Sequence, residues 1–248
     1  MHAYVAFFVE NSPTFGEWLS WFPPFLVWAY GCLFLAGYLK RNQGLKTGYT
    51  RKIFHFLIFT SATAIQTVWG LRPLCLFGAA TSVVIFYAVL RGDGHLLYEA
   101  LAREKDAPHR TYYILAPYCA TLIGGVTSNA LFGQVALVGY LITGLGDAIG
   151  EPVGTRFGKH PYRVPAFRGV PSTRSYEGSA AVFLMSLLAI IIAASLVPEL
   201  RFTGRSLLLF PGLALLSVVL EAFSPHGWDN AVMQIVPSCC ASLFLIIS

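Results

Sequence analysis

The sequence has few charged residues. Asp, Glu, Lys and Arg make up 12% of its 248 residues, whereas a typical soluble domain carries about 25%. It also lacks a fixed-period repeat and a low-complexity tract. No basic stretch precedes its first apolar residues, as a cleaved signal peptide would require. The low content of charged residues argues against a soluble globular protein, which needs a charged surface in water.

Two kinds of site are also missing. The five cysteines form no C-x-x-C pair, so we expect packing residues rather than a thiolate metal site. The formal charge of +5 is not gathered on a basic arm or soluble face, so we expect no nucleic-acid partner.

What the sequence has is long apolar runs. Hydrophobic residues make up 56% of the chain, and a helix needs about 20 of them in succession to cross a bilayer core of about 30 Å. We predict an all-α integral membrane helix bundle, with about 7–8 transmembrane helices in a single domain over residues 1–248. The fourth and fifth spans are either a tight helical hairpin or include a re-entrant segment. The predicted spans are 22–39, 53–69, 74–90, 112–126, 130–146, 179–197, 207–223 and 232–247.

The basic residues are distributed unevenly between these spans. Fourteen of the 17 Lys and Arg residues lie in the first, third and fifth connections. The positive-inside rule makes that side cytosolic and places both termini on the other side. The membrane would be the plasma membrane in a prokaryote, or the endoplasmic reticulum or a plastid membrane in a eukaryote.

Most acidic residues fall on the same side, and two of them lie at predicted span ends. A carboxylate at the depth of Asp147 or Glu221 is unfavourable unless it is paired or hydrated, so both are candidate site residues. A transporter is one alternative, because such carboxylates also mark ion pathways. It should place them near the bilayer midplane, however, rather than along one face.

The richest stretch opens a predicted cytosolic loop, 147–178. Asp147 and Glu151 are four residues apart and offer the oxygen ligands that Mg²⁺ prefers, although Pro152 makes a continuous helix doubtful. Glycines allow backbone amides to approach an anion, and basic side chains add charge. The stretch is not a P-loop, because His160 occupies the Ser/Thr position. The alternative is a flexible basic loop. The candidate phosphate-binding residues here are Gly146, Gly154, Arg156, Gly158 and Lys159.

Near the start of the second span, Arg51, Lys52 and His55 form a further candidate group. Arg51 and His55 share one helix face. The alternative is that the two cations are interfacial anchors.

A third stretch leads into the sixth span. Ser175 fits the N-cap of a helix, and Glu177 fits its first turn. The same helix N-terminus, with Arg174 and Gly178, would also suit phosphate.

The last stretch contains Glu221, Asp229 and Asn230. A short turn between two spans explains the polar residues after Ser224. Glu221, inside the apolar end of the seventh span, is harder to explain in this way.

These four stretches together resemble a family, the membrane-embedded CTP-dependent kinases of lipid alcohols: dolichol kinase, phytol and farnesol kinases, and the yeast-type diacylglycerol kinase. The sequence is more distantly similar to phosphatidate cytidylyltransferase. It departs from the family pattern at Glu151, where many members carry a small or apolar residue, and at Arg174, where lysine is usual. The resemblance is carried by Arg51, Lys52, His55, Gly146, Asp147, Gly154, Arg156, Phe157, Gly158, Lys159, Ser175, Glu177, Gly178, Ser179, Glu221, Asp229 and Asn230.

The resemblance implies phosphoryl transfer from CTP, with Mg²⁺, to a lipid hydroxyl at the cytosolic face. Asp147 would hold Mg²⁺, with Glu151 or Glu177 as a second ligand or base. Lys52 or His55 would steady the triphosphate, and Lys159, Arg156 and Arg174 would bind phosphates. The nearer alternative is a cytidylyltransferase, which the surplus of arginines at Arg163, Arg168 and Arg174 favours.

Overall fold

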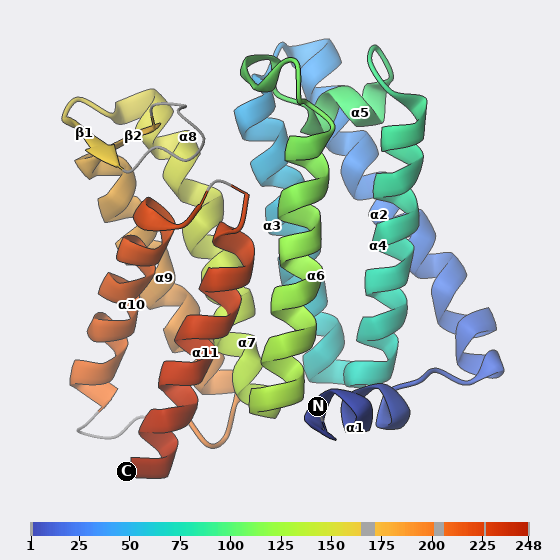
Figure 1. The fold of residues 1–248 in the computed structure, drawn as a ribbon, viewed down its shortest axis with the longest axis vertical. Coiled ribbons are helices and arrows are strands. Elements are labelled where there is room, and N and C mark those ends of the chain that lie inside the picture. Colours follow the sequence, from blue (N-terminus) through green and yellow to red (C-terminus); the bar gives the residue numbers. More distant parts are fainter. Residues whose placement is uncertain (1, 165–171, 201–205, 226, 248) are drawn as a thin grey trace. The chain divides into compact units, whose positions relative to one another are not determined.

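The computed structural model describes residues 2–164, 172–200, 206–225 and 227–247. It is 84% helical, which confirms the predicted all-α class, and it contains one small antiparallel hairpin of two strands (Figure 1). The chain divides into two compact units, Met1–Leu115 and Ala116–Ser248, and each is described here by itself. The prediction of a single domain over 1–248 therefore stays a prediction.

The first unit is built around three long helices. Helix α2 packs against α4, α3 and the short helix α5, and its buried face includes Ala29, Leu33 and Ala36. The elements of this unit are α1 (His2–Glu10), α2 (Phe15–Gln43), α3 (Thr47–Trp69), α4 (Leu71–Arg91), α5 (Leu96–Leu101) and the 3₁₀ turn η1 (Glu104–Asp106).

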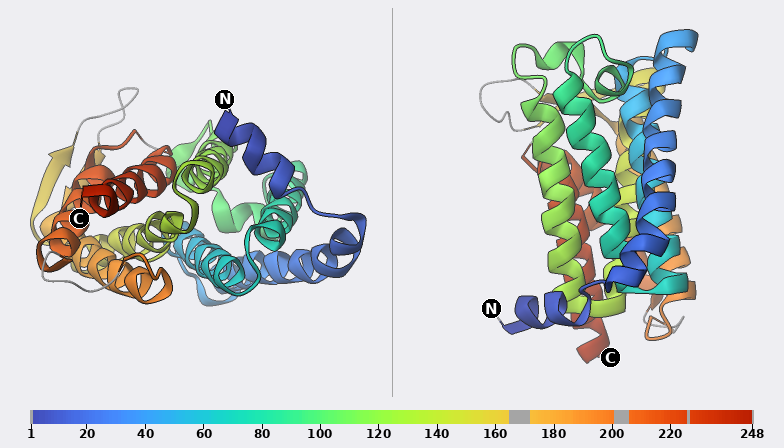
Figure 2. Two further views of the ribbon diagram at one scale, coloured as in Figure 1. Left: turned by 90° about the horizontal axis from the view of Figure 1, so that it is seen from below. Right: turned by 90° about the vertical axis from the view of Figure 1, so that its right-hand side faces the viewer.

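Helix α2 carries clear signals at both ends. Thr14 and Glu17 form a capping box, in which the Glu17 amide donates to Thr14 Oγ1 and the Thr14 amide donates to a Glu17 carboxylate oxygen. The helix ends at Gly44, whose φ of 65° is in the left-handed region that glycine tolerates. Helix α1, in contrast, runs across the ends of the long helices rather than along them (Figure 2).

The second unit is organised around α9. Helices α8 and α10 and the turn η3 pack against it, and α11 packs against α7 and α10. Helix α6 (Tyr112–Phe132) crosses the boundary between the two units. It is followed by η2 (Gly133–Val135), α7 (Ala136–Leu141), the π-helical turn η3 (Ile142–Asp147), α8 (Ala148–Phe157), β1 (Pro161–Val164), β2 (Ser172–Ser175), α9 (Tyr176–Leu196), α10 (Ser206–Phe223) and α11 (Asp229–Ile247).

The chain reverses direction between α6 and α7, where Gly133 has a positive φ of 55° (Figure 1). The fourth and fifth predicted spans thus form a helical hairpin, and a re-entrant segment within it stays a prediction.

Every predicted span falls on a helical segment, but fewer segments qualify as membrane-spanning. Among the described residues, five are long and apolar enough to cross a membrane: Phe15–Gln43, Leu71–Arg91, Tyr112–Phe157, Tyr176–Leu196 and Asp229–Ile246. Helix α3 is not among them, and in α10 the apolar part, Leu208–Phe223, is shorter. The predicted number of seven to eight spans is therefore not confirmed.

Candidate functional site

The predicted loop 147–178 is wrong in its first half, because residues 148–157 form helix α8. The run from α7 through η3 to α8 is continuous, and Pro152 does not interrupt it. Proline is tolerated in membrane helices where neighbouring helices and local π adjustments satisfy the backbone groups that it leaves. The second half of the loop contains strands β1 and β2.

Asp147 lies where the π-helical turn ends. Its side chain is almost fully buried, at 3% exposure, and Glu151 follows one helical turn later with partial exposure. The two carboxylates therefore share one helix face, as expected for residues four apart. Single π-helical turns inside α-helices occur frequently at functional sites.

Arg174 is the basic centre of the second unit. It lies on β2, paired in register with Tyr162 of β1. Its Nε is 2.9 Å from Oε1 of Glu221, which lies near the end of α10 and is 7% exposed. Figure 1 shows the hairpin at the same end of this unit as the end of α10 and the start of α11.

The surroundings of Arg174 are acidic. Burial lowers the pKa of Arg174, but the charges of its acidic neighbours outweigh burial, and the net effect raises the pKa above its ordinary value. Arg174 therefore stays charged at any working pH and balances part of a larger negative charge. The acidic neighbours, in order of their effect, are Glu221, Asp147, Asp229 and Glu151.

The hairpin is fixed to the start of α9. Ser175 Oγ accepts from the Gly178 amide at 3.1 Å, which is the N-cap that the sequence suggested. Tyr162 OH lies 2.7 Å from Ser179 Oγ, and the Tyr176 amide donates to the His160 carbonyl at 3.1 Å. Arg174 thus projects from a strand that is held at its base.

Glu177 is occupied by a different partner. One carboxylate oxygen is 2.6 Å from Nδ1 of His160, and the other accepts from the His160 amide at 3.4 Å. Within the described ranges, no three His, Cys, Asp or Glu side chains gather closely enough to hold a metal ion. The structure therefore does not bring Asp147, Glu151 and Glu177 together as one set of ligands.

The glycines of the same stretch face α9. A Cβ on Gly146 would overlap with Ser186 Oγ, and one on Gly150 would lie 2.7 Å from Val182 Cγ2. Gly154, Gly158 and Gly178 surround Ser175 Oγ in the same way. Within a helix most amides bond to the preceding turn. The missing side chains of these glycines let neighbouring segments approach closely, so close packing explains their presence. That they bind a phosphate stays a prediction.

The basic residues after α8 are exposed. Arg156 lies with its guanidinium 5.4 Å from the centre of the Phe157 ring, and Lys159 lies just beyond the helix. Both are accessible to a ligand in water. Arg163 lies on β1, and Arg168 lies outside the described residues.

Asp229 and Asn230 open α11 and have different surroundings. Asp229 Oδ1 accepts from the Asn230 amide at 3.0 Å. The Asn230 side chain is buried and donates to the Pro117 carbonyl at 3.2 Å and to Thr121 Oγ1 at 2.8 Å. Asn230 therefore holds α11 against α6.

The contact of Asn230 continues along α11 as a buried polar seam that sequence reasoning missed. Gln234 Nε2 donates to the Thr121 carbonyl at 3.3 Å, and Ser238 Oγ accepts from the Gly139 amide at 3.2 Å. Asn230, Gln234 and Ser238 are spaced four apart, and this spacing in an apolar helix is the signal that identifies the seam. Such side chains join helices within membranes.

Lys52 and His55 lie on α3 in the first unit, together with Arg51. All three are partly buried. The His55 ring centre is 4.5 Å from that of Phe59.

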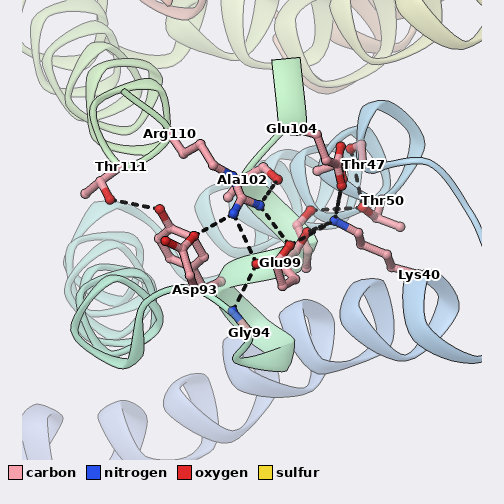
Figure 3. Close-up of polar contacts among 12 residues, drawn as sticks. Lys40, Thr47, Thr50, Asp93, Gly94, Glu99, Ala102, Glu104, Arg110 and Thr111 are labelled. Atoms are coloured by element: carbon pink, nitrogen blue, oxygen red, sulfur yellow. Dashed lines mark hydrogen bonds and ion pairs between the residues drawn. The ribbon is translucent and has the colours of Figure 1, made fainter. Parts of the chain in front are cut away.

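The first unit contains a second polar cluster, around Glu99 (Figure 3). Arg110 Nη2 donates to Glu99 Oε2 at 2.8 Å and to the Ala102 carbonyl at 2.9 Å. Lys40 Nζ donates to the same carboxylate at 3.2 Å and to Glu104 Oε1 at 2.7 Å. From the sequence these residues are predictable only as charges in the connections, because no local motif links positions so far apart.

The pKa of Glu99 reflects this cluster. Burial alone raises the pKa, but hydrogen bonds from Arg110, the Gly94 amide and Lys40 outweigh it and lower the pKa to about 2. The carboxylate is thus ionised and well paired, so the cluster fixes the connection between α4 and α6 to the end of α2.

Comparison with known proteins gives one informative relative. The chain is 33% identical over 187 residues to a phytol kinase from Synechocystis sp. (strain ATCC 27184 / PCC 6803 / Kazusa), and the match covers 75% of each chain. The chain belongs to the phytol kinase family. No family model and no solved structure matches the sequence of this chain. The match supports the predicted lipid kinase family, whereas membership among dolichol or diacylglycerol kinases stays a prediction.

Proposed function

We propose that this protein is a CTP-dependent kinase that phosphorylates the hydroxyl group of a lipid alcohol at the cytosolic face of the membrane. Phytol is the first acceptor to test; farnesol, dolichol, another polyprenol and diacylglycerol are the others. The observation that carries the proposal is the similarity over three quarters of the chain to a phytol kinase.

The geometry of the second unit supports this reaction class. Asp147 and Glu221 are both more than 90% buried, and the charge of each carboxylate acts on Arg174. Phosphoryl transfer requires mainly alignment of the reactants and neutralisation of charge. Carboxylates that can hold a metal ion, together with a basic side chain near them, meet both requirements. Arg156 and Lys159 are exposed nearby in the sequence and would meet the triphosphate from the water side.

Mg²⁺ fits the oxygen ligands available here. This ion usually takes one or two carboxylates, several waters and the phosphates of its substrate, so a set of three protein ligands is not required. Asp147 would hold it. Glu151, one turn further along the same helix face, would be either a second ligand or the base, whereas Glu177 is engaged with His160. When bound, the ion would neutralise charge on the phosphates.

The transfer itself is a single displacement. The lipid hydroxyl oxygen forms a bond to the γ-phosphorus of CTP, and the bond from that phosphorus to the β–γ bridging oxygen breaks. CDP leaves with the electron pair, and the hydroxyl proton passes to a carboxylate, for which Glu151 is the candidate. The products are the lipid monophosphate and CDP.

Labelled CTP tests the proposal directly. The purified protein in detergent or nanodiscs is incubated with γ-labelled or α-labelled CTP, Mg²⁺ and each alcohol, and lipid extracts are counted. We expect label in the lipid from γ-labelled CTP and none from α-labelled CTP. The other three nucleoside triphosphates, labelled in the same way, are the comparison donors and should transfer less label. Label from α-labelled CTP, with phosphatidate as acceptor, would instead identify a cytidylyltransferase.

A further inference from the structure

Glu221 is a buried carboxylate whose position calls for an explanation. It lies near the end of α10, an apolar helix, with 9% of its side chain exposed. An ionised carboxylate at such a place needs a charged or donating partner. Arg174 Nε, 2.9 Å away, is that partner. The pair joins two segments that are far apart in the sequence.

The backbone that carries Arg174 is fixed, but the reach of its side chain is long. Strand β2 pairs with β1 and passes directly into the N-cap of α9 at Ser175. Arginine retains several rotatable bonds beyond Cβ, and ordering them requires a contact near the guanidinium. The Glu221 carboxylate, 2.9 Å from Nε, provides an ion-pair contact at this point of the side chain.

Acidic neighbours make this ordering important. Asp147, Glu151 and Asp229 also act on the charge of Arg174, so several carboxylates compete for it. Without a dedicated partner, the guanidinium would distribute among them. An arginine that moves between carboxylates cannot present one fixed surface to a phosphate.

We propose that Glu221 is a positioning residue rather than a metal ligand: it holds the Arg174 guanidinium in the orientation that binds the phosphates of the nucleotide. The inference rests on the proposed function and deepens it. It moves Glu221 from the residues predicted to bind the nucleotide directly to a supporting role behind Arg174.

The test is a double-mutant cycle on nucleotide binding. Binding of CTP with Mg²⁺ to the full chain in nanodiscs is measured by calorimetry for the parent, Glu221→Gln, Arg174→Gln and the double variant. We expect each single variant to weaken binding about tenfold or more. The double variant should bind CTP with about the affinity of whichever single variant binds less tightly, because both changes remove the same interaction.

A Mg²⁺ titration separates positioning from metal binding. The Mg²⁺ concentration that gives half-maximal turnover should stay at the parent value in Glu221→Gln and rise in Asp147→Asn. A rise in Glu221→Gln, or additive effects in the cycle, would overturn the inference. Glu199→Gln, an exposed carboxylate outside the site, is the matched control.

Two further variants keep the test valid if Glu221→Gln does not fold. Glu221→Asp and Arg174→Lys retain the charges but change the reach and remove the guanidinium plane, and they should show the same non-additive weakening. Coupled nucleotide binding without γ-phosphoryl transfer to any alcohol would reject the proposed function alone. Phosphoryl transfer with uncoupled residues would reject this inference alone, and no binding of any nucleoside triphosphate by the parent would reject it too.

Discussion

At the scale of single residues, burial and pairing separate the candidate site into parts. Asp147 and Glu221 are buried acids, and the charges of both act on Arg174. Glu177 and Asn230 have polar partners that fix local structure. Residue type alone therefore does not identify a chemical role in this unit, whereas the partner of each side chain does.

Asp147 gives the sharpest prediction of activity. Asp147→Asn keeps the size of the side chain and removes its charge, so turnover should fall on the order of a hundredfold or more if charge stabilisation dominates catalysis. Initial rates over a Mg²⁺ series would measure this effect, together with a weaker dependence on Mg²⁺. The melting temperature without nucleotide should stay near that of the parent. Normal turnover in the folded variant would exclude a metal role for Asp147.

Glu99 gives a prediction about pH. Its folded-state pKa of about 2 lies below the ordinary value of 4.5. It therefore contributes stability above about pH 4.5, and this contribution is lost as the pH falls towards 2. Glu99→Gln should lower the free energy of unfolding in detergent by about 1 to 3 kcal/mol at pH 7. The difference from the parent should shrink as the pH approaches 2.

The comparison for Glu99 is Glu199→Gln, which removes an exposed carboxylate and should change little at either pH. A difference for Glu99→Gln that is independent of pH between 7 and 2 would show that Glu99 acts through packing and not through its charge.

At the scale of elements, the glycine-rich stretch is a helix contact. Gly146 and Gly150 lie one turn apart against Ser186 and Val182 of α9. Small residues at this spacing bring membrane helices close enough for backbone packing. Asp147 directly precedes α8 and the hairpin leads directly into α9. Close contact between these two helices therefore helps to fix Asp147 relative to the hairpin.

Gly146→Ala tests this contact. The added methyl group would overlap with Ser186 Oγ, so we expect a loss of about 1 to 3 kcal/mol in the free energy of unfolding, as for other overpacked interiors. Gly212→Ala on α10 is the control, because nothing lies within 4 Å of its added Cβ. Ser186→Gly should restore part of the loss in Gly146→Ala. Equal stability of the Gly146 and Gly212 variants would contradict the packing role.

The helices were predictable from the sequence, whereas the contact of the glycine-rich stretch with α9 was not, for a physical reason. Apolar runs determine where a helix is stable in a membrane, so every predicted span falls on one. A glycine is compatible both with a phosphate-binding loop and with a close helix contact, and the choice depends on what α9 presents to it. The Arg174–Glu221 pair likewise joins positions 47 residues apart, a distance over which no local pattern operates.

At the scale of the whole molecule, each unit has basic side chains gathered at one end. In the first unit, Lys40 and Arg110 lie in the cluster at the α5 end, whereas Arg72 near α1 lies 3.8 Å from Glu17 and donates to the Glu10 carbonyl. In the second unit, Arg156 and Arg174 lie at the hairpin end. Lys and Arg residues next to apolar spans stay on the cytosolic side of the membrane, so the distribution of these residues predicts which end faces the cytosol.

The orientation that follows is the last prediction: the hairpin end faces the cytosol and both chain termini face away from it. Thr155 and Ser12 are exposed residues suited to test it, one at each predicted side. The five native cysteines are first replaced by serine or alanine, and the background is checked for activity. Thr155→Cys and Ser12→Cys are then treated in intact cells or sealed vesicles with a maleimide that cannot cross the membrane.

We expect Ser12→Cys to react from the outside, and Thr155→Cys to react only after the membrane is opened. The physical reason is that moving many arginine and lysine side chains across the membrane is opposed during insertion, whereas the terminal segments carry little positive charge. The opposite labelling pattern would invert the topology and place the acidic centre outside the cytosol. CTP is a cytosolic nucleotide, so that result would also remove the donor from the proposed reaction.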